Sequence, residues 1–317
     1  MQYKFHFHPY KRQFIRPLQT NHGTWDIREG IIIHLVSETG NIGFGEIAPI
    51  PWFGSETIEQ ASEFCQQLPS QISEEIIFSI PDRLPTCQFG FESAWKMLNE
   101  TLEIEKRINP NPLKFSALLP AGNAALNAWK CLWKNGYRTF KWKISINPIV
   151  EEIAIFESFV QALPEGAKLR LDANGGLNYD EANLWLFTCD RMMAKNHSLD
   201  IEFIEQPLPP SQFIEMLELG NCYGTKIALD ESVATLEQLE TCYQNGWCSI
   251  FVIKPGIIGS PSRLRQFCQQ YQIDAVFSSV FETDIGRNAA LRLAEELSLH
   301  KRAVGFGINH WFSEDNS

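Results

Sequence analysis

The sequence predicts an α/β fold, in which an N-terminal α+β domain is followed by a closed (β/α)7β barrel, a modified form of the TIM barrel. Two observations lead to this fold class. The first is a change near residue 110 from short strands, turns and helices to a regular alternation of strand-like and amphipathic segments. The second is the set of strand-like segments in that alternation, which begin at Leu113, Thr139, Lys168, Ile201, Lys226, Ser249, Asp274 and Arg302.

Strands and then helices are predicted in the N-terminal part. Residues 1–8 alternate in the way a strand does. Residues 31–36 and 42–48 predict the two strands of a hairpin, because a Gly-Asn turn separates them. Residues 57–68 and 89–105 have helical patterns. Together these segments predict an α+β unit.

The second part predicts parallel strands joined by crossover helices. Seven amphipathic segments lie between the strands, among them 147–163, 179–193, 236–245 and 286–297. Eight parallel strands favour a closed barrel, although their number alone also fits a doubly wound open sheet. We therefore divide the chain into an α+β domain at 1–110, a barrel at 111–308 and a tail at 309–317 that could pack on the first domain.

Composition narrows the class of partner. With 317 residues, 44% of them hydrophobic, the chain can bury a large core. Its formal net charge of -11 disfavours nucleic acid and anionic membranes and favours a small-molecule substrate. The eight cysteines contain no CxxC pair and should be reduced, and no signal-peptide or membrane-spanning pattern is present, so the expected compartment is the cytoplasm. The sequence leaves open whether the chain is a monomer or a homo-oligomer.

Charged side chains stand at the ends of five consecutive predicted strands. They are Lys141 and Lys143 on the second strand, Asp172 on the third, Glu205 on the fourth, Asp230 on the fifth and Lys254 on the sixth. Because barrel enzymes have their active sites at the carboxyl ends of the strands, we expect these side chains to form one site. Three carboxylates suit Mg²⁺ better than Zn²⁺, which prefers His and Cys.

Two lysines should lie side by side on the second strand. Since strand side chains alternate, Lys141 and Lys143 share a face, and Trp142 points outward to the helices. Two ammonium groups beside a cation should each have a lowered pKa, which makes a neutral lysine available as a base.

Each of these residues also has a structural interpretation. Asp172 or Asp230 alone would be read as a helix N-cap, a lone Lys-x-Lys as a solvated edge, and Glu205 as a loop residue. Caps and solvated edges have no reason to fall at corresponding ends of five strands in the order Lys, Asp, Glu, Asp, Lys. The combination therefore favours a catalytic site.

This arrangement resembles the enolase superfamily, and within it the muconate-lactonising subgroup, over nearly the whole chain. The resemblance implies an enolase-like fold with a capping domain before the barrel. It also implies an Mg²⁺ site, in which Mn²⁺ could substitute, and abstraction of a proton beside a carboxylate to give an enediolate. By matching positions, the metal ligands are Asp172, Glu205 and Asp230, and the catalytic lysines are Lys143 and Lys254 on opposite sides of the substrate, with Lys141 assisting.

Loop sequences resemble the o-succinylbenzoate synthase family of that subgroup. Residues 16–23 with 28–30 resemble its flexible cap loop, 43–55 a second loop that closes over the substrate, and 277–286 the segment after the seventh strand, from which Val280 and Thr283 depart. The resemblance implies dehydration of 2-succinyl-6-hydroxy-2,4-cyclohexadiene-1-carboxylate to o-succinylbenzoate, a step toward menaquinone or phylloquinone. It further implies that Lys143 moves the proton, that Lys254 stays charged, and that the substrate contacts are Asn174, Ser278, Ser279 and Val280.

Alternatives remain at the sequence level. The same two lysines would serve an N-acylamino acid racemase or another epimerase, although the Asp-x-Asp expected on the eighth strand of a dipeptide epimerase is absent from 305–309. A non-catalytic barrel would be expected to have lost a ligand or a base. Glu231 and Glu282 could orient ligands or lysines, or could pair structurally. Glycines 43, 45 and 54 could serve turn geometry, and Trp52 and Phe53 could pack between domains.

Overall fold

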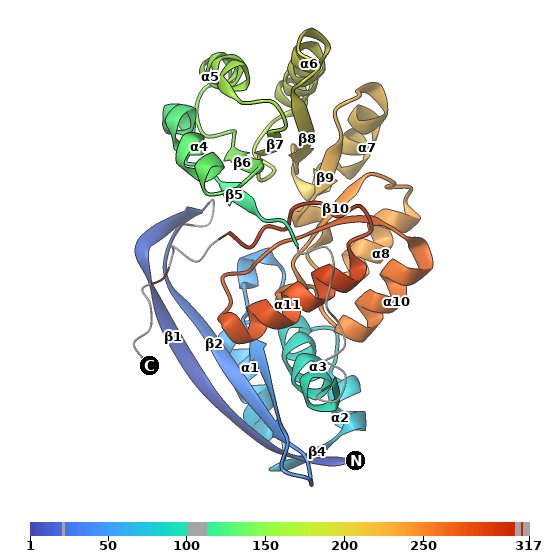
Figure 1. The fold of residues 1–317 in the computed structure, drawn as a ribbon. Coiled ribbons are helices and arrows are strands. Elements are labelled where there is room, and N and C mark those ends of the chain that lie inside the picture. Colours follow the sequence, from blue (N-terminus) through green and yellow to red (C-terminus); the bar gives the residue numbers. More distant parts are fainter. Residues whose placement is uncertain (21–22, 101–112, 308–311, 313–317) are drawn as a thin grey trace.

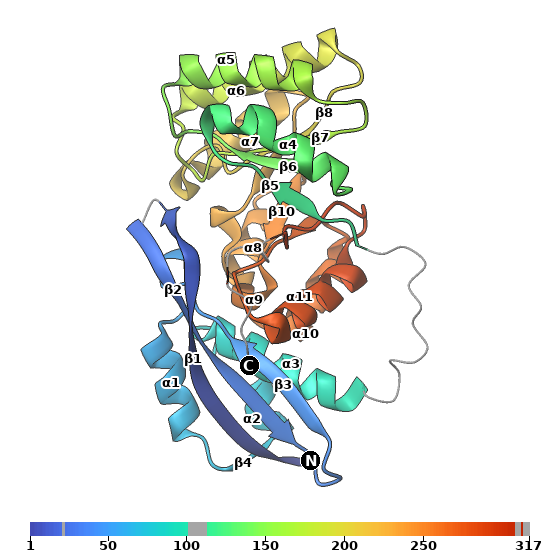
Figure 2. The ribbon, with the colours of Figure 1, turned by 60° about the vertical axis from the view of Figure 1, so that its left-hand side comes forward.

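The computed structural model describes residues 1–20, 23–100, 113–307 and 312, and it contains two sheets, each with its own helices (Figures 1 and 2). The first is antiparallel, with the strand order β3-β2-β1-β4. Its strands are β1 (Gln2–Thr20), β2 (Gly23–Val36), β3 (Ile42–Ile47) and β4 (Gln71–Ser73). The helices packed with it are α1 (Ile58–Gln67), α2 (Glu74–Phe78) and α3 (Pro85–Glu100). We call this part the cap.

The cap is held together by the apolar face of the sheet. Alternate side chains Ile31, Ile33 and Leu35 of β2 are fully buried among residues from α1 and α3. A Cβ at Gly43 or Gly45 would collide with backbone carbonyl oxygens of α3. These two glycines therefore let β3 lie directly against α3, which is a packing role and not the turn role that we considered.

A long β1–β2 arm contains the described part of the segment that resembles a flexible cap loop. Residues 16–20 continue β1 and residues 23–30 begin β2, in antiparallel register with a bulge between Gln13 and Leu18. Residues 21 and 22 lie outside the described residues. The described part of the segment that resembles a flexible cap loop is therefore paired backbone, and its role as a flexible loop stays a prediction.

The second sheet is parallel and has the order β11-β10-β9-β8-β7-β6-β5. Its strands are β5 (Ser116–Leu118), β6 (Thr139–Lys143), β7 (Lys168–Asp172), β8 (Asp200–Glu205), β9 (Ile227–Leu229), β10 (Ile250–Ile253) and β11 (Asp274–Phe277). The helices are α4 (Ala125–Lys134), α5 (Ile149–Ala162), α6 (Tyr179–Lys195), α7 (Phe213–Cys222), α8 (Leu236–Gln244), α9 (Pro255–Ile258), α10 (Pro261–Tyr271) and α11 (Asp284–Leu297).

Two isolated bridges close this sheet into a barrel. Val304 pairs with Phe115 ahead of β5, and Gly305 pairs with Ser278 after β11, both in parallel. The eighth predicted strand is thus present as a short bridge between the first and the seventh. The closed (β/α)7β barrel is confirmed, and the doubly wound open sheet is excluded.

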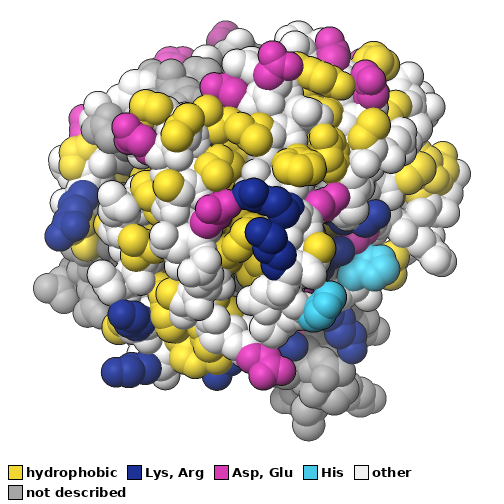
Figure 3. All heavy atoms as spheres, turned by 90° about the horizontal axis from the view of Figure 1, so that it is seen from above, with side chains coloured by type: hydrophobic (Ala, Val, Ile, Leu, Met, Phe, Trp, Pro, Cys, Tyr) yellow, Lys and Arg dark blue, Asp and Glu magenta, His cyan; other side chains and the backbone are white. Residues whose placement is uncertain are grey.

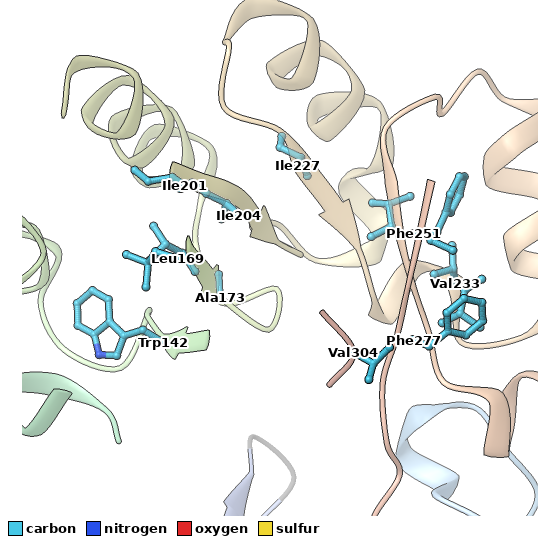
Figure 4. Packing of buried hydrophobic residues seen from close by; sticks show 14 of the residues in the cluster. Trp142, Leu169, Ala173, Ile201, Ile204, Ile227, Val233, Phe251, Phe277 and Val304 are labelled. Carbon is cyan, nitrogen blue, oxygen red and sulfur yellow. The ribbon is translucent and has the colours of Figure 1, made fainter. Parts of the chain in front are cut away.

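Side-chain alternation divides the barrel into an inner and an outer layer. Figure 4 shows residues of the larger buried cluster, which includes Trp142. Trp142 points outward, as predicted, with its ring centroid 6.0 Å from that of Phe159 on α5 and 6.3 Å from that of Trp185 on α6. An inner cluster comprises Phe203, Ala228, Ile250, Val252 and Val276. The residues that follow in register on the inner face are the charged ones at the strand ends, so packing of the core fixes where the site lies.

The predicted boundary between cap and barrel lies within residues 101–112, which are outside the described residues. Most of the predicted tail, 309–317, is also outside them. Phe312 is described, and it is bridged to Phe14 of β1, with stacked rings 4.6 Å apart.

On the outer surface seen from above, apolar side chains are interspersed with acidic and basic ones (Figure 3). Within the described ranges, no helix has the length and apolar character needed to cross a membrane.

Candidate active site

Five consecutive barrel strands bring the predicted charged residues to one end of the barrel. The hydrogen-bonded register pairs Lys143 of β6 with Asp172 of β7, and Asp172 with Glu205 of β8. Asp230 lies two residues beyond the β9 partner of Glu205 and therefore shares its face. Lys254 follows β10 directly. The structure thus gathers residues that are widely separated in sequence at a common rim.

Two lysines hold the carboxylates. Lys141 Nζ lies 2.8 Å from Asp172 Oδ2 and 2.7 Å from Glu205 Oε1, so one ammonium group bridges two neighbouring strands. Lys254 Nζ forms a very close ion pair with Asp230. Both pairs are largely shielded from water, which strengthens them.

Three neighbouring carboxylates dominate the pKa of Lys141 in this structure. Burial by itself lowers the pKa of Lys141, but the charges of Asp172, Glu205 and Asp230 outweigh burial and raise it. Lys141 is thus held as a cation between two carboxylates. The lowered pKa was predicted for a lysine beside a bound divalent cation, and it stays a prediction.

The three carboxylates suit a hard divalent cation. Asp172, Glu205 and Asp230 are at most 6% exposed, and carboxylate oxygen is the ligand type that Mg²⁺ prefers. Burial raises the pKa of Glu205; Lys141 opposes this effect, and the charges of Asp172 and Asp230 add to it. Burial likewise raises the pKa of Asp230, against the charge of Lys254. A cation among these groups would relieve the cost of burying them as anions.

The carboxylates do not already form a metal cage. Across the part of the chain that the structure describes, no three His, Cys, Asp or Glu side chains lie close enough to share one ion. Lys141 stands between Asp172 and Glu205, and Lys254 holds Asp230. For all three to bind one cation, their side chains must come closer together than they lie here.

Gln206 organises the ends of two strands, a role that our sequence analysis missed. Its side chain is buried and its φ is 38°, in the left-handed region. Its Oε1 accepts hydrogen bonds from the backbone N–H of Asp230 at 2.9 Å and of Ser232 at 3.2 Å, and its Nε2 donates to Leu208 O at 2.9 Å. Its position between the candidate ligand Glu205 and Pro207 is the sequence feature that could have indicated this role. Through these hydrogen bonds, Gln206 fixes Asp230 relative to Glu205.

Asn174 and Glu231 join the loops after β7 and β9. The backbone N–H of Asn174 donates to Asp172 Oδ1 at 3.1 Å, and its side-chain Nδ2 donates to Glu231 Oε1 at 3.1 Å. Burial and the charge of Asp172 raise the pKa of Glu231. Glu231 therefore orients Asn174 and contributes negative charge beside the trio.

Residues of the cap cover the rim. Phe53, in the short 3-10 helix Pro51–Phe53, places its ring centroid 4.0 Å from Lys254 Nζ, which is a cation–π contact. The Trp52 ring lies 4.9 Å from that of Trp25 on the β1–β2 arm. The interpretation of packing between domains thus describes Phe53, which touches Lys254 of the barrel, whereas the ring contact of Trp52 lies within the cap. Gly54 has a φ of 101°, so its turn role holds.

The segment after β11 is folded on itself. Ser279 and Val280 are buried, and Glu282 accepts hydrogen bonds from Ser279 Oγ at 2.9 Å and from the Val280 N–H. The N–H of Ser278 donates to Ile253 O at 2.9 Å. Glu282 therefore pairs structurally with the segment that we predicted to contact the substrate. Whether Ser278, Ser279 and Val280 bind substrate stays a prediction.

A (β/α)7β barrel beneath an α+β cap, with carboxylates on three consecutive strand ends between lysines, defines the enolase superfamily. Family models agree: residues 124–315 match the enolase C-terminal domain-like model, and residues 17–98 match the MenC N-terminal domain model. More closely, the chain belongs to the o-succinylbenzoate synthase family, which confirms both levels of the resemblance that the motifs indicated.

Three relatives illustrate this membership. The o-succinylbenzoate synthase of Thermosynechococcus vestitus is 41% identical over 308 residues, which are 96% of this chain and 92% of that protein. The crystal structure of the Thermosynechococcus elongatus enzyme complexed with Mg in the active site matches with a TM-score of 0.89 at 40% identity, over 98% of this chain and 94% of that one. The L-Ala-D/L-Glu epimerase of Bacillus subtilis, 20% identical with a TM-score of 0.75 over 98% and 91% of the two chains, shares the fold.

Proposed function

We propose that this chain catalyses the Mg²⁺-dependent dehydration of 2-succinyl-6-hydroxy-2,4-cyclohexadiene-1-carboxylate to o-succinylbenzoate, in the biosynthesis of menaquinone or phylloquinone. The observation that supports this most is the placement of Lys143 and Lys254 on either side of three buried carboxylates at one rim of the barrel. The 41% identity to a named o-succinylbenzoate synthase points to the same reaction.

Lys143 is the proposed base and acid. Its neutral amine takes the ring proton beside the substrate carboxylate, and the resulting ammonium returns that proton to the departing hydroxyl group, which leaves as water as the C–O bond breaks. The electron pair of the broken C–H bond becomes part of the aromatic ring. Lys143 ends the cycle neutral, so no further reagent is needed.

Lys254 and Lys141 act through charge in this proposal. The Lys254 ammonium, placed between Asp230 and the Phe53 ring, faces the side of the substrate opposite Lys143 and stabilises negative charge that develops there. Lys141 keeps Asp172 and Glu205 in position. Asn174, Ser278, Ser279 and Val280 are the proposed substrate contacts.

Asp172, Glu205 and Asp230 are the proposed ligands of Mg²⁺. When bound, the ion supplies positive charge for the substrate carboxylate. Mn²⁺ is a proposed substitute, because it also accepts carboxylate and water oxygen. Gln206 and Glu231 would keep two of these ligands and Asn174 in position.

The test is to incubate the purified protein with Mg²⁺ and the cyclohexadiene substrate and to follow the absorbance change as the ring becomes aromatic. We expect turnover by the wild type and loss of at least about a thousandfold in kcat for Lys143→Ala. Absence of turnover by folded wild-type protein with either Mg²⁺ or Mn²⁺ would refute the proposal. Deuterium exchange at the α-carbon of N-acylamino acids would then identify the racemase alternative.

We also propose that the chain works in the cytoplasm on a small-molecule carboxylate. All eight cysteines are unpaired, five of them buried, which suits a reducing compartment.

A further inference from the structure

Two buried carboxylates of the cap each bind the N-terminus of a barrel helix. Glu46, at the end of β3, contacts the first turn of α11. Glu92, on α3, contacts the first turn of α10, where it accepts a hydrogen bond from the Ser262 N–H at 2.8 Å and another from Ser260 Oγ. An anionic side chain is stabilised at such a helix end by the free N–H groups and the helix dipole. The two contacts have the same chemistry but different neighbours.

Glu46 is bound more extensively than docking of two domains requires. Its side chain is fully buried, and both carboxylate oxygens lie 2.9 Å from the Thr283 N–H nitrogen. Its Oε2 also accepts from the Gly286 N–H at 2.9 Å and from the Thr283 hydroxyl. A Cβ on Gly286 would lie 2.8 Å from Oε2, so glycine at this position leaves room for the carboxylate.

Tyr10 of β1 completes the ligation of Glu46. Its hydroxyl donates a short hydrogen bond to Glu46 Oε1, across the intervening strand β2. A Cβ on Gly30 of β2 would collide with the Tyr10 ring, so this glycine makes the crossing possible. Burial and the charge of Glu46 raise the pKa of Tyr10, which therefore stays a donor at neutral pH.

The segment that Glu46 holds is the one between β11 and α11, and its backbone is strained. Phe281 has a φ of 62°, in the left-handed region that non-glycine residues adopt only rarely. The rings of Phe14 and Trp25 on the β1–β2 arm lie 5.4 and 5.6 Å from the Phe281 ring. Cap residues thus contact this segment on two sides, at Phe281 and at Thr283.

We propose that Glu46 is a positioning residue that, together with Tyr10, sets the conformation of residues 278–283 and thereby the affinity of the site for its substrate. This inference rests on the proposed function for the identity of the substrate. The contacts described for Glu46 include neither Lys143 nor Lys254, so it acts on substrate binding and leaves the chemical step to Lys143. Glu92, bound to α10, has no contact with residues 278–283 among those described for it.

Glu46→Gln tests this role. A glutamine amide puts a donor where the carboxylate now faces the N–H groups of Thr283 and Gly286, so one contact becomes repulsive in either orientation of the amide. We expect KM for the cyclohexadiene substrate to rise about tenfold or more while kcat stays within about threefold. Tyr10→Phe removes one hydrogen bond and should shift KM in the same direction by a smaller factor.

Glu92→Gln is the matched control, because it changes a buried carboxylate of the cap at another helix N-terminus. We expect it to lower the unfolding temperature as Glu46→Gln does, with KM within about twofold of the wild type. If both variants leave KM unchanged, or raise it equally, Glu46 is merely a docking residue and the inference is overturned.

Amide hydrogen exchange supplies a measurement of the positioning role that does not depend on turnover. Exchange of the amides of residues 280–286 should be faster in Glu46→Gln than in the wild type, and unchanged there in Glu92→Gln. Should the wild type fail to turn over the substrate, the proposed function fails, and this comparison still decides the positioning role. Equal exchange in both variants would count against it.

Discussion

At the scale of single residues, buried carboxylates decide much of the behaviour of this protein. Glu282 illustrates the physics outside the candidate metal site. Burial raises the pKa of Glu282, the hydrogen bonds from Val280 and Ser279 lower it, and the charge of Glu46 raises it, with a net rise. A carboxyl group with a raised pKa holds its proton in the folded state at pH values where the unfolded chain has lost it.

This shift predicts a pH dependence of stability. Between the ordinary pKa of Glu282 and its raised folded-state pKa, the native protein binds more protons than the unfolded chain, so the free energy of unfolding falls as pH increases. Glu282→Gln removes this titration. Its free energy of unfolding, relative to that of the wild type, should therefore increase from about pH 4.5 to about pH 7. Urea unfolding of both proteins at these two pH values, with chelator present, measures the difference. The exposed Glu237→Gln is the control, and profiles that stay parallel for Glu282→Gln and wild type would contradict the assignment.

Residues of the candidate site could be predicted only where the residue type at a strand end indicates its function by itself. Asp172, Glu205 and Asp230 could be located because strand alternation and the carboxyl-end rule place them without knowledge of any contact. The role of Glu46 could not, since its partners Thr283 and Gly286 are more than 230 residues away and no local pattern specifies that contact. The contact of Lys141 with both Asp172 and Glu205 was likewise not predictable, because it depends on which charges the fold brings around the ammonium group.

At the scale of helices and strands, local patterns predict the bounds of several helices, whereas strand pairing depends on contacts between backbones that these patterns do not specify. Helices α5, α6, α8 and α11 begin and end within two residues of the predicted segments, because amphipathic periodicity and caps are local properties. The extent of the β1–β2 arm was not predicted, since residues 16–23 and 28–30 were interpreted only through their resemblance to a flexible loop. Its pairing is instead maintained by the cross-strand register from Lys4 with Val36 to Thr20 with Gly23.

The contact of β3 with α3 gives a prediction for Gly45. A Cβ at this position would collide with the Gly90 carbonyl oxygen, a backbone atom that cannot turn aside. We expect Gly45→Ala to lower the free energy of unfolding by about 3 kcal/mol. Gly220 of α7 has open space around the position of a Cβ, so Gly220→Ala should raise it by about 1 kcal/mol through helix propensity. Denaturant unfolding measures both, and a Gly45→Ala variant as stable as wild type would show that β3 and α3 can separate freely.

At the scale of the whole molecule, the cap and the barrel act as one structure whose active end concentrates negative charge. Carboxylates from β7, β8 and the end of β9 meet beneath the cap, and two lysines compensate them only in part. Burial raises the pKa of Glu205 and of Asp230, so the folded state bears an electrostatic cost at this rim. A ligand that binds the folded state and removes this cost should stabilise the entire molecule.

Addition of Mg²⁺ should therefore raise the unfolding temperature of the chelator-treated protein, and chelation should reverse the rise. At about a hundred times its dissociation constant, a ligand adds about 2.7 kcal/mol, which corresponds to roughly 4 °C for a chain of this size. Asp230→Asn should abolish most of the rise, because it removes a proposed ligand. Asp274→Asn is the control: it breaks the ion pair with Arg302 at the opposite end of the barrel, so it should destabilise the protein and still respond to Mg²⁺. An equal response of Asp230→Asn and Asp274→Asn would place the bound ion somewhere other than this rim.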